Sequence, residues 1–290
     1  MEIKIGDRLV GDNHPAYVIA EIGINHNGDI DTACALISEA TEAGCDAVKF
    51  QKRSVEIVYT AEELARPRES PFGTTNGELK WGLEFGLKQY DEINEWATYQ
   101  GIEWFGSGWD TPSVHFLDTF DPPCHKIASA CLTDLELINV VAATKKPLLV
   151  STGMSTLGQI DRAMDVIARH ENDVVLLQCT STYPSEDKHL NLRCLETLRQ
   201  RYGCLVGYSG HEHGLATTVA AVALGACVVE RHLTLDRSSW GSDQAASLEP
   251  QGFKHMVRDI RAVEAAMGTG NKTILPEEVP IAAKLRRVLV

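Results

Sequence analysis

The sequence lacks an excess of basic residues. Among its 290 residues, 27 are lysine or arginine and 40 are aspartate or glutamate, which gives a formal net charge of -13. We expect no nucleic-acid partner, because proteins that bind nucleic acid present a basic surface to the phosphates. The N-terminal stretch MEIKIGDRLVG also lacks a long apolar run. Neither a signal peptide nor a membrane-spanning segment is predicted, and we expect no membrane partner.

Paired cysteines and glycine-rich nucleotide motifs are also missing. The eight cysteines form no CxxC pair and are scattered through predicted helices and strands. This spacing favours reduced thiols and a cytoplasmic location over a disulfide framework. The sequence contains no dinucleotide-binding fingerprint. Its hydrophobic fraction is 44%, which is enough for a large core.

One pattern repeats along the chain. A short β-branched run is followed by a turn rich in Gly, Ser, Asn or Thr and then by an amphipathic helical stretch, and this alternation predicts a parallel sheet. Eight units favour a closed (β/α)8 TIM barrel, with an open doubly wound sheet as the structural alternative. The predicted strands lie at residues 17–23, 46–51, 103–108, 124–129, 147–153, 174–179, 204–210 and 227–233.

Three further segments define the predicted domain organisation. Residues 2–12 predict a small hairpin that caps the barrel. Residues 67–80 are polar and contain glycine, and we interpret them as a mobile loop over the site or, alternatively, as an ordinary surface loop. Residues 1–270 are predicted to form one catalytic barrel that includes the hairpin, and residues 271–290 a C-terminal tail without a second domain.

Two histidines follow neighbouring predicted strands. His211 lies in GYSGHEHG and His232 lies in ERHLTLDR. Catalytic groups of (β/α)8 barrels lie where strands end and βα loops begin. Two imidazoles at such positions are able to share a metal ion, although a structural role for each remains the alternative.

Lysines occur inside two other predicted strands, Lys49 in VKFQ and Lys126 in HKIAS. A lysine inside a barrel is costly unless an anion accompanies it. Two interpretations remain open: the lysines pair with Glu21 or Glu230, or they bind the phosphate or carboxylate of a substrate. Hydroxyl-bearing turns that suit oxyanions follow other strands and contain Ser129, Ser151 and Ser209.

Three more polar residues lie at strand ends or on rim loops. Glu21, at the end of the first predicted barrel strand, is suited to orient a metal-bound water or a sugar hydroxyl. Tyr183 and Asp243 lie on predicted rim loops. Each is either a contact for a polyol or an ordinary surface residue.

Taken in order, seven segments resemble the sialic acid (N-acetylneuraminate) synthase family over roughly residues 5–268. Members of this family condense phosphoenolpyruvate with an aldose, release phosphate and make a 2-keto-3-deoxy sugar acid. They depend on a metal, usually Mn²⁺, and use a (β/α)8 barrel. The segments are AEIGINHNG, VKFQ, KIAS, LLVSTGM, CTSTYPS, GYSGHEHG and ERHLTLDR with GSDQAAS.

The resemblance implies a role for each matching position. His211 and His232 resemble the metal ligands, with Mn²⁺ as the expected ion. The residues that match positions around the sugar and the metal are Glu21, Tyr183, Glu230 and Asp243. The residues that match phosphoenolpyruvate-binding positions are Lys49, Lys126, Ser129, Ser151, Ser209 and Ser181, the last in place of an asparagine. The residues predicted to act in catalysis are Glu21, Lys49, Lys126, Glu230 and Asp243.

Two features depart from the family pattern. Cys131, in KIASACLTD, stands where members carry an acidic residue that contacts the sugar. Many members continue into a small antifreeze-like domain that brings an arginine to the partner's active site, and we expect a barrel without that domain here. Both departures concern the sugar half of the site.

The sequence therefore predicts a phosphoenolpyruvate-dependent synthase that is a cytoplasmic homodimer. Its predicted second substrate is N-acetylmannosamine, a related hexose or its phosphate. Two alternatives remain: a Schiff-base aldolase that uses Lys49 or Lys126, and a non-catalytic barrel that binds a metabolite.

Overall fold

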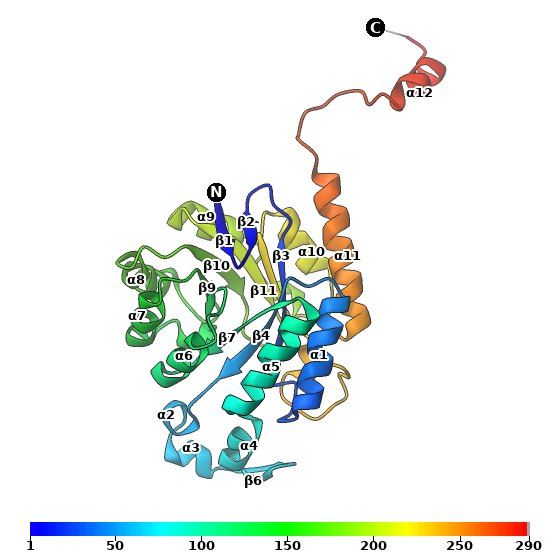
Figure 1. The fold of residues 1–290 in the computed structure, drawn as a ribbon. Helices are drawn as coiled ribbons and strands as arrows, with labels where there is room; N and C mark the ends of the chain where they lie inside the picture. Colours follow the sequence, from blue (N-terminus) through cyan, green and yellow to red (C-terminus); the bar gives the residue numbers. More distant parts are fainter. Residues whose placement is uncertain (289–290) are drawn as a thin grey trace.

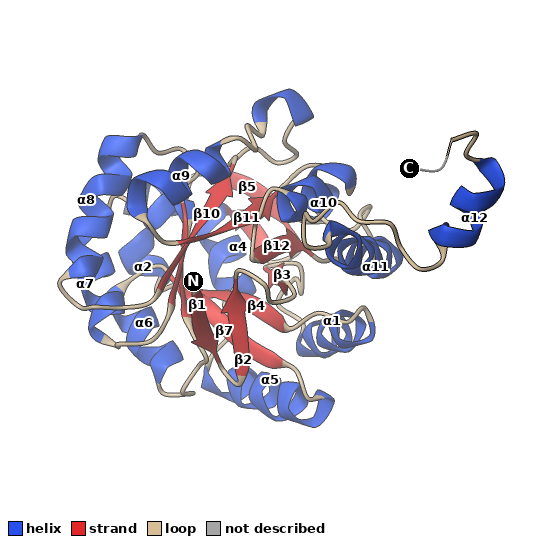
Figure 2. Ribbon diagram, turned by 90° about the horizontal axis from the view of Figure 1, so that it is seen from above, coloured by secondary structure: helices blue, strands red, loops and turns tan. Residues whose placement is uncertain are grey.

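The computed structural model describes residues 1–288 and contains a closed barrel of eight parallel strands in the order β10-β11-β12-β3-β4-β7-β8-β9. The predicted (β/α)8 TIM barrel is therefore confirmed, and the open sheet is excluded. Figure 1 shows the barrel from the side, and Figure 2 shows it from above. The barrel strands are β3 (Tyr17–Gly23), β4 (Ala47–Lys52), β7 (Glu103–Gly108), β8 (His125–Ile127), β9 (Leu148–Ser151), β10 (Val174–Cys179), β11 (Leu205–Gly210) and β12 (Val228–His232).

Helices surround the barrel (Figure 2). Each buries an apolar stripe on the strands. In α8, for example, Ile160, Ala163 and Ile167 are buried at helical spacing, and Thr156 with Gln159 forms a capping box that begins the helix. The surrounding helices are α1 (Ile30–Glu42), α5 (Leu87–Gln100), α6 (Thr111–Asp118), α7 (Leu135–Ala143), α8 (Leu157–Ala168), α9 (Cys194–Tyr202), α10 (Ala216–Ala223) and α11 (Pro250–Met267).

The side chains of each strand alternate between the barrel interior and the helix layer. In β3, Val18 and Ala20 belong to the core cluster shared with α1, α5 and α11. Tyr17 and Ile19 belong to a different cluster, which fills the barrel interior. Continuing this alternation brings Glu21 to the interior at the carboxyl end of β3. The same period of two brings polar side chains of other strands to this end of the barrel.

The N-terminal hairpin closes the opposite end of the barrel. Strands β1 (Glu2–Ile5) and β2 (Arg8–Gly11) pair antiparallel, as the sequence predicts. Ile3, Ile5 and Val10 pack in the same apolar cluster as the lower interior residues of the barrel. The hairpin therefore seals that end with apolar side chains and leaves the carboxyl ends of the strands open.

The expectation of a loop at residues 67–80 is wrong. This segment forms β5 (Pro67–Ser70), β6 (Gly73–Thr75) and the first part of α4 (Asn76–Leu83), and it follows the short helices α2 (Val55–Val58) and α3 (Ala61–Ala65). Thr75 and Glu78 make a capping box that begins α4. The Thr-x-x-Glu spacing that signals this helix start is visible in the sequence.

The last part of the described chain extends away from the barrel. After α11, residues 268–277 form no regular element, and α12 (Glu278–Leu285) lies apart from the barrel in Figure 1. The last two residues of the predicted tail, 289–290, lie outside the described residues, and the boundary at residue 270 stays a prediction. All eight cysteines are free thiols. Among residues 1–288, no helix is both long enough and apolar enough to cross a membrane.

Candidate active site

The carboxyl ends of the barrel strands surround a cavity of about 220 Å³. Position-by-position alternation along the strands explains why polar side chains meet there. All of the predicted site residues except Asp243 and Cys131 line this cavity. The predicted residues that line it are Glu21, Lys49, Lys126, Ser129, Ser151, Ser181, Tyr183, Ser209, His211, Glu230 and His232.

Two lysines and two glutamates form a buried charge cluster at the floor of the cavity. Lys49 Nζ lies 2.9 Å from Glu21 Oε2 and 3.5 Å from Glu230 Oε2. Lys126 Nζ lies 3.7 Å from Glu230 Oε1. Each of the four side chains is at most 5% exposed. The lysines therefore pair with both glutamates, as one of the open interpretations states, while their ammonium groups still face the cavity.

Within the charge cluster, the pKa values of Glu21 and Glu230 shift in opposite directions. Burial, reinforced by the nearby charge of Glu230, raises the pKa of Glu21 even though Lys49 opposes the shift. Burial would also raise the pKa of Glu230, but the charges of Lys126 and Lys49 outweigh it and lower this pKa to about 2. Burial lowers the pKa of Lys126. Two carboxyl groups whose acidities diverge are suited to different roles, one as a proton carrier and one as a fixed charge.

Hydroxyl groups flank the lysines. Lys126 Nζ donates to Ser151 Oγ at 2.7 Å, and Ser209 Oγ donates to Glu230 Oε1 at 2.9 Å. The backbone N–H of Gly153 donates to Ser129 Oγ at 3.0 Å. These contacts hold the side chains at the cavity wall, and Ser151, which accepts from Lys126, keeps its own O–H for an oxyanion.

Gly153 is required by this close approach. A Cβ atom at position 153 would lie 2.3 Å from Ser181 Oγ, 2.8 Å from Ser129 Oγ and 3.2 Å from Cys179 Sγ. Any side chain there would push the hydroxyl groups apart. The glycine therefore lets two predicted site residues meet at one wall.

The two predicted metal ligands come together. His232 is the last residue of β12, His211 directly follows β11, and their ring centroids are 5.4 Å apart. His211 Nδ1 lies 2.8 Å from the backbone oxygen of Thr180, so an N–H at Nδ1 leaves Nε2 as an acceptor. Burial lowers the pKa of His232 to about 3, which keeps its imidazole neutral.

These observations fit a divalent ion. The neutral imidazole of His232 is suited to bind a metal, and a backbone oxygen that fixes one ring nitrogen, as at His211, commonly orients the other toward the ion. The contact with Cys179 outweighs burial and raises the pKa of His211, which favours its protonated form when no ion is bound. Nδ1 of His232 is buried and has no hydrogen-bond partner among residues 1–288. Within that part of the chain, no group of three or more His, Cys, Asp or Glu side chains is arranged to hold a metal. The protein therefore offers two histidine ligands, and further donors would be water or substrate.

Tyr183 and Asp243 lie beside the histidines. The ring centroid of Tyr183 is 4.1 Å from that of His211 and 5.7 Å from that of His232. Asp243 Oδ2 lies 3.9 Å from His232 Nδ1, although Asp243 does not line the cavity. Both residues thus adjoin the candidate metal site.

The structure does not bring Cys131 to this cavity. Its side chain is buried in the apolar cluster with Leu132 and Leu137, and it lines a separate hollow. Burial raises the pKa of the thiol to about 11. Trp109 and Ala130 line both the cavity and the hollow, so they form the wall between Cys131 and the charge cluster.

Several cavity residues were not predicted from the sequence. Ser107 Oγ accepts from Lys49 Nζ at 3.2 Å, and Gln51 Nε2 donates to Glu21 Oε1 at 2.6 Å. Gln51 lies two positions after Lys49, so the period of two was a signal that could have identified it. The unpredicted residues that line the cavity are Gln51, Ser107, Trp109, Ala128, Ala130, Met154 and Cys179.

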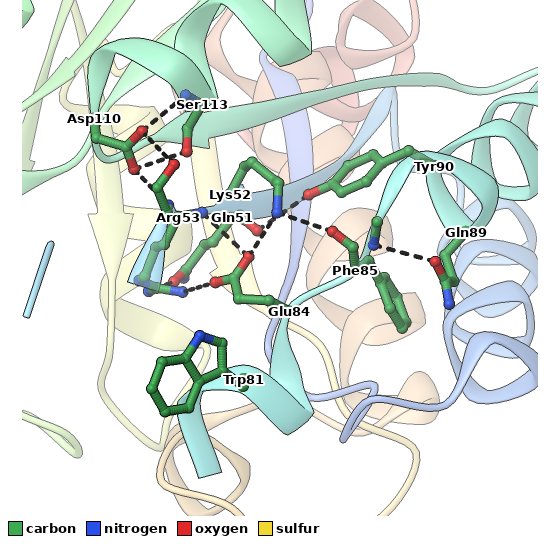
Figure 3. A network of polar contacts seen from close by, with 12 residues as sticks. Gln51, Lys52, Arg53, Trp81, Glu84, Phe85, Gln89, Tyr90, Asp110 and Ser113 are labelled. Carbon is green, nitrogen blue, oxygen red and sulfur yellow. Dashed lines mark hydrogen bonds and ion pairs between the residues drawn. The ribbon is translucent and has the colours of Figure 1, made fainter. Parts of the chain in front are cut away.

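A polar network holds the end of β4 in place, as Figure 3 shows. Lys52 Nζ and Arg53 Nη1 lie 3.2 and 3.4 Å from oxygens of Glu84. The guanidinium carbon of Arg53 lies 4.2 Å from the centroid of a Trp109 ring, and Arg53 also donates to Gln51 Oε1. With its amide oxygen occupied in this way, Gln51 presents its N–H to the charge cluster.

Comparison with known proteins identifies the family. A model described as the NeuB family matches residues 36–272. The chain belongs to the NeuB family. Human N-acetylneuraminate-9-phosphate synthase is 40% identical over 286 residues, which cover 98% of this chain and 80% of that protein. N,N'-diacetyllegionaminic acid synthase of Legionella pneumophila is 36% identical over 285 residues, which cover 96% of this chain and 80% of that protein.

A solved structure agrees with this membership. The N-acetylneuraminic acid synthetase of Leptospira borgpetersenii matches 99% of this chain and 98% of its own, with a TM-score of 0.87 and 28% identity. The resemblance to sialic acid synthases is confirmed, and so is the prediction that this NeuB family member is an enzyme of the synthase class.

The charge cluster leads to a testable prediction about the pKa values of Glu21 and Glu230. In ¹³C NMR titrations of the carboxyl groups, Glu21 should titrate at a higher pH than Glu230. Lys126→Met should raise the pKa of Glu230 above its value of about 2, because the Lys126 charge is the strongest influence that lowers it. Lys146→Met is the control, since Lys146 pairs with exposed Asp121; it should change neither value. Equal titration of both carboxyl groups in the parent would contradict this interpretation.

The same shift predicts a pH dependence of stability. The folded-state pKa of Glu230, about 2, lies below the ordinary carboxyl value of about 4.3. Glu230 therefore stabilises the fold fully above pH of about 4.3, and this contribution is lost as the pH falls toward about 2. Lys126→Met should reduce that acid dependence in chemical unfolding measurements.

Proposed function

We propose that this NeuB family protein condenses phosphoenolpyruvate with an aldose to make a 2-keto-3-deoxy sugar acid and phosphate. The observation that carries the proposal is that one cavity brings together two groups of residues. These groups are Lys49 and Lys126 with serine hydroxyls, and the pair His211 and His232. One group suits a substrate with a carboxylate and a phosphate. The other suits a divalent ion that contacts a carbonyl oxygen.

The lysines would bind the anionic substrate in exchange for part of their contact with the glutamates. Charge-assisted hydrogen bonds to carboxylate or phosphate are about twice as strong as neutral ones. The hydroxyl group of Ser151, which accepts from Lys126 Nζ, adds a neutral O–H donor beside that lysine. Lysines that face a cavity from its floor hold the anion at a fixed place, which is most of what such a condensation requires.

The proposed reaction forms one carbon–carbon bond and one carbon–oxygen bond, and it breaks the carbon–oxygen bond to the phosphate. C3 of phosphoenolpyruvate bonds to the aldehyde carbon of the sugar, whose oxygen becomes a hydroxyl group. The oxygen of a water molecule bonds to C2, and one proton of that water passes to the new sugar hydroxyl group. The bond from C2 to the phosphate oxygen then breaks, and the phosphate leaves with the bonding electrons and the second proton of that water, so that the C2 oxygen becomes a carbonyl. Glu21, whose pKa is raised, is suited to take the proton from that water, while Glu230 remains a fixed negative charge.

His211 and His232 would hold the metal, which we propose is Mn²⁺ because histidine with oxygen donors suits that ion. When bound, the ion supplies a Lewis acid that polarises the aldehyde oxygen. Asp243 and Tyr183 lie next to these histidines and would orient water or sugar hydroxyl groups around the ion.

The proposed aldose is N-acetylmannosamine, a related hexose or its phosphate. The named relatives make different sugar acids, which supports the class of substrate rather than one sugar. The proposed aldose-binding side of the cavity contains Gln51, Trp109 and Tyr183. We also propose a homodimer in the cytoplasm: family resemblance supports the dimer, and eight free thiols support the compartment.

The test is release of phosphate from phosphoenolpyruvate with Mn²⁺ and a panel of aldoses. Mannose, N-acetylmannosamine and their 6-phosphates form the panel. We expect phosphate release with at least one of them, loss of activity on chelation, and loss of bound metal and activity in His211→Ala and His232→Ala with the fold intact. His255→Ala is the control, because His255 is a helical histidine outside the cavity whose ring lies within hydrogen-bond distance of Gln251. Full metal content in both single variants would contradict the assignment of His211 and His232 as metal ligands.

The lysines give a second prediction. Loss of one buried charge-assisted contact costs about 2 kcal/mol or more, so Lys49→Met and Lys126→Met should each lower kcat/KM for phosphoenolpyruvate by about 30-fold, which is that energy expressed as a rate ratio. Lys254→Met, which removes a surface contact to Glu42, is the control. Parental kinetics in both lysine variants would leave these residues a structural role.

Lys126 also supports a second candidate. A buried lysine with a lowered pKa is able to form a Schiff base with a carbonyl substrate. If Lys126 forms a Schiff base, borohydride reduction in the presence of pyruvate or an aldose should leave the substrate covalently attached to Lys126. We expect no label, because both lysines are ion-paired; a labelled lysine together with chelator-resistant activity would favour the aldolase.

The dimer is tested by light scattering. We expect a mass of twice the 31.8 kDa chain at micromolar concentration. A monomeric mass in an active sample would contradict the proposed assembly.

A further inference from the structure

A second ion pair lies behind the two histidines, on the outer face of the barrel wall. Glu212 follows His211 in the chain, and Arg231 precedes His232. Since side chains alternate along a strand, His232 lines the cavity whereas Arg231 points to the helix layer, where it contacts α10. Arg231 Nη1 donates to Glu212 Oε1 at 3.0 Å, and both side chains are 0% exposed.

This pair has several further partners, although Arg231 Nε has none among residues 1–288. Arg231 Nη1 also donates to Thr218 Oγ1 at 2.7 Å and to the backbone oxygen of Gly214 at 2.9 Å. Glu212 accepts from the hydroxyl groups of Tyr208 and Thr218, each at 2.8 Å. A buried pair with this many directional partners has one well-defined geometry, and its position relative to β11, β12 and α10 is fixed.

The pair also connects the backbone on either side of the candidate metal site. Arg231 Nη2 donates to the backbone oxygen of Glu212, the residue after His211. The backbone N–H of Ser185 donates to the backbone oxygen of His211 at 2.9 Å. Hydrogen bonds therefore join Ser185 and the side chain of Arg231 to the backbone at the end of β11, next to the His211 ring.

The strand wall leaves space for the pair at Gly210. In the register of β11 with β12, Gly210 lies opposite Arg231. A Cβ atom at position 210 would lie 2.6 Å from Glu212 Oε2 and 3.0 Å from Arg231 Cδ. The missing side chain thus lets the ion pair lie directly against the wall, one residue before His211.

We propose that the Glu212–Arg231 ion pair is a positioning device that fixes the spacing of His211 and His232 and thereby sets the affinity for the divalent ion. This inference rests on the proposed function, in which the two histidines bind that ion. Neither Glu212 nor Arg231 lines the cavity, so the pair acts through the backbone at the ends of β11 and β12.

The test measures Mn²⁺ binding to the full chain without substrates, by isothermal titration calorimetry. E212L/R231M replaces the ion pair with apolar side chains, a change that often preserves stability. We expect an unfolding midpoint close to that of the parent and an Mn²⁺ affinity about 10- to 100-fold weaker, the usual result when groups that orient metal ligands are replaced. A purely structural pair would leave Mn²⁺ affinity unchanged in a folded double variant.

A second variant keeps the test decisive if the double variant fails to fold. R231K retains the charge, but a single ammonium group cannot reach Glu212 Oε1 and the backbone oxygens of Glu212 and Gly214 as the guanidinium fork does. We expect a folded protein whose Mn²⁺ affinity is several-fold weaker than that of the parent. Parental affinity in every folded variant would overturn the inference.

Arg261→Met is the matched control. Arg261 lies 3.6 Å from buried Asp46 at the opposite end of the barrel, and its loss should lower stability without changing Mn²⁺ affinity. An equal loss of affinity in this control would mean that affinity merely follows stability, which also overturns the inference. If the parent binds no Mn²⁺, or binds it equally after His211→Ala, the proposed function fails instead.

Discussion

The structure depends on one constraint: two ammonium groups and two carboxylates are buried at the upper end of a barrel whose lower interior is apolar. Burial of any one of these charges alone would be costly. Lys49, Lys126, Glu21 and Glu230 are tolerated together because each has a partner of opposite sign within 3.7 Å. An anionic substrate that binds the lysines disturbs this balance. Since Glu21 has the raised pKa, it is the carboxyl group that most readily takes up a proton to restore the balance.

The alternation of side chains along β11 and β12 separates two electrostatic tasks. Glu230 faces inward and contacts the cavity lysines, whereas Arg231, the next residue, faces outward and pairs with Glu212. The inner cluster borders a cavity and is able to exchange partners with a ligand. The outer pair is sealed between the wall and α10 and keeps one geometry. The adjacent histidines therefore have an exchangeable charge cluster on one side and a fixed ion pair on the other.

The sequence predicts most of the fold because buried parallel strands are continuous apolar runs. The predicted strands at residues 103–108 and 174–179 coincide with β7 and β10. The polar composition of residues 67–80 favours a loop, whereas the Thr-x-x-Glu spacing of Thr75 and Glu78 indicates the start of a helix, which is what the structure contains. The sequence alone does not decide whether Lys49 and Lys126 pair with the glutamates or bind a substrate anion. The answer depends on which strands become neighbours and in what register. Motifs in the sequence predict Tyr183 and the two histidines. Trp109 lies outside these motifs, and Cys179, although it begins the segment CTSTYPS, is assigned no role by them.

The position of Cys131 shows where sequence reasoning about a single site residue ends. The short 3₁₀ turn at Ser129–Cys131 directs Ser129 to the cavity and buries Cys131 among apolar side chains. Burial at this position favours a thiol over a carboxylate, because removing an ionised group from water is costly. A ligand group in the cavity would have to pass the wall of Trp109 and Ala130 to reach this sulfur. Under the proposed function, an aldose in the cavity would contact Gln51, Tyr183 and the wall of Trp109 and Ala130 rather than residue 131.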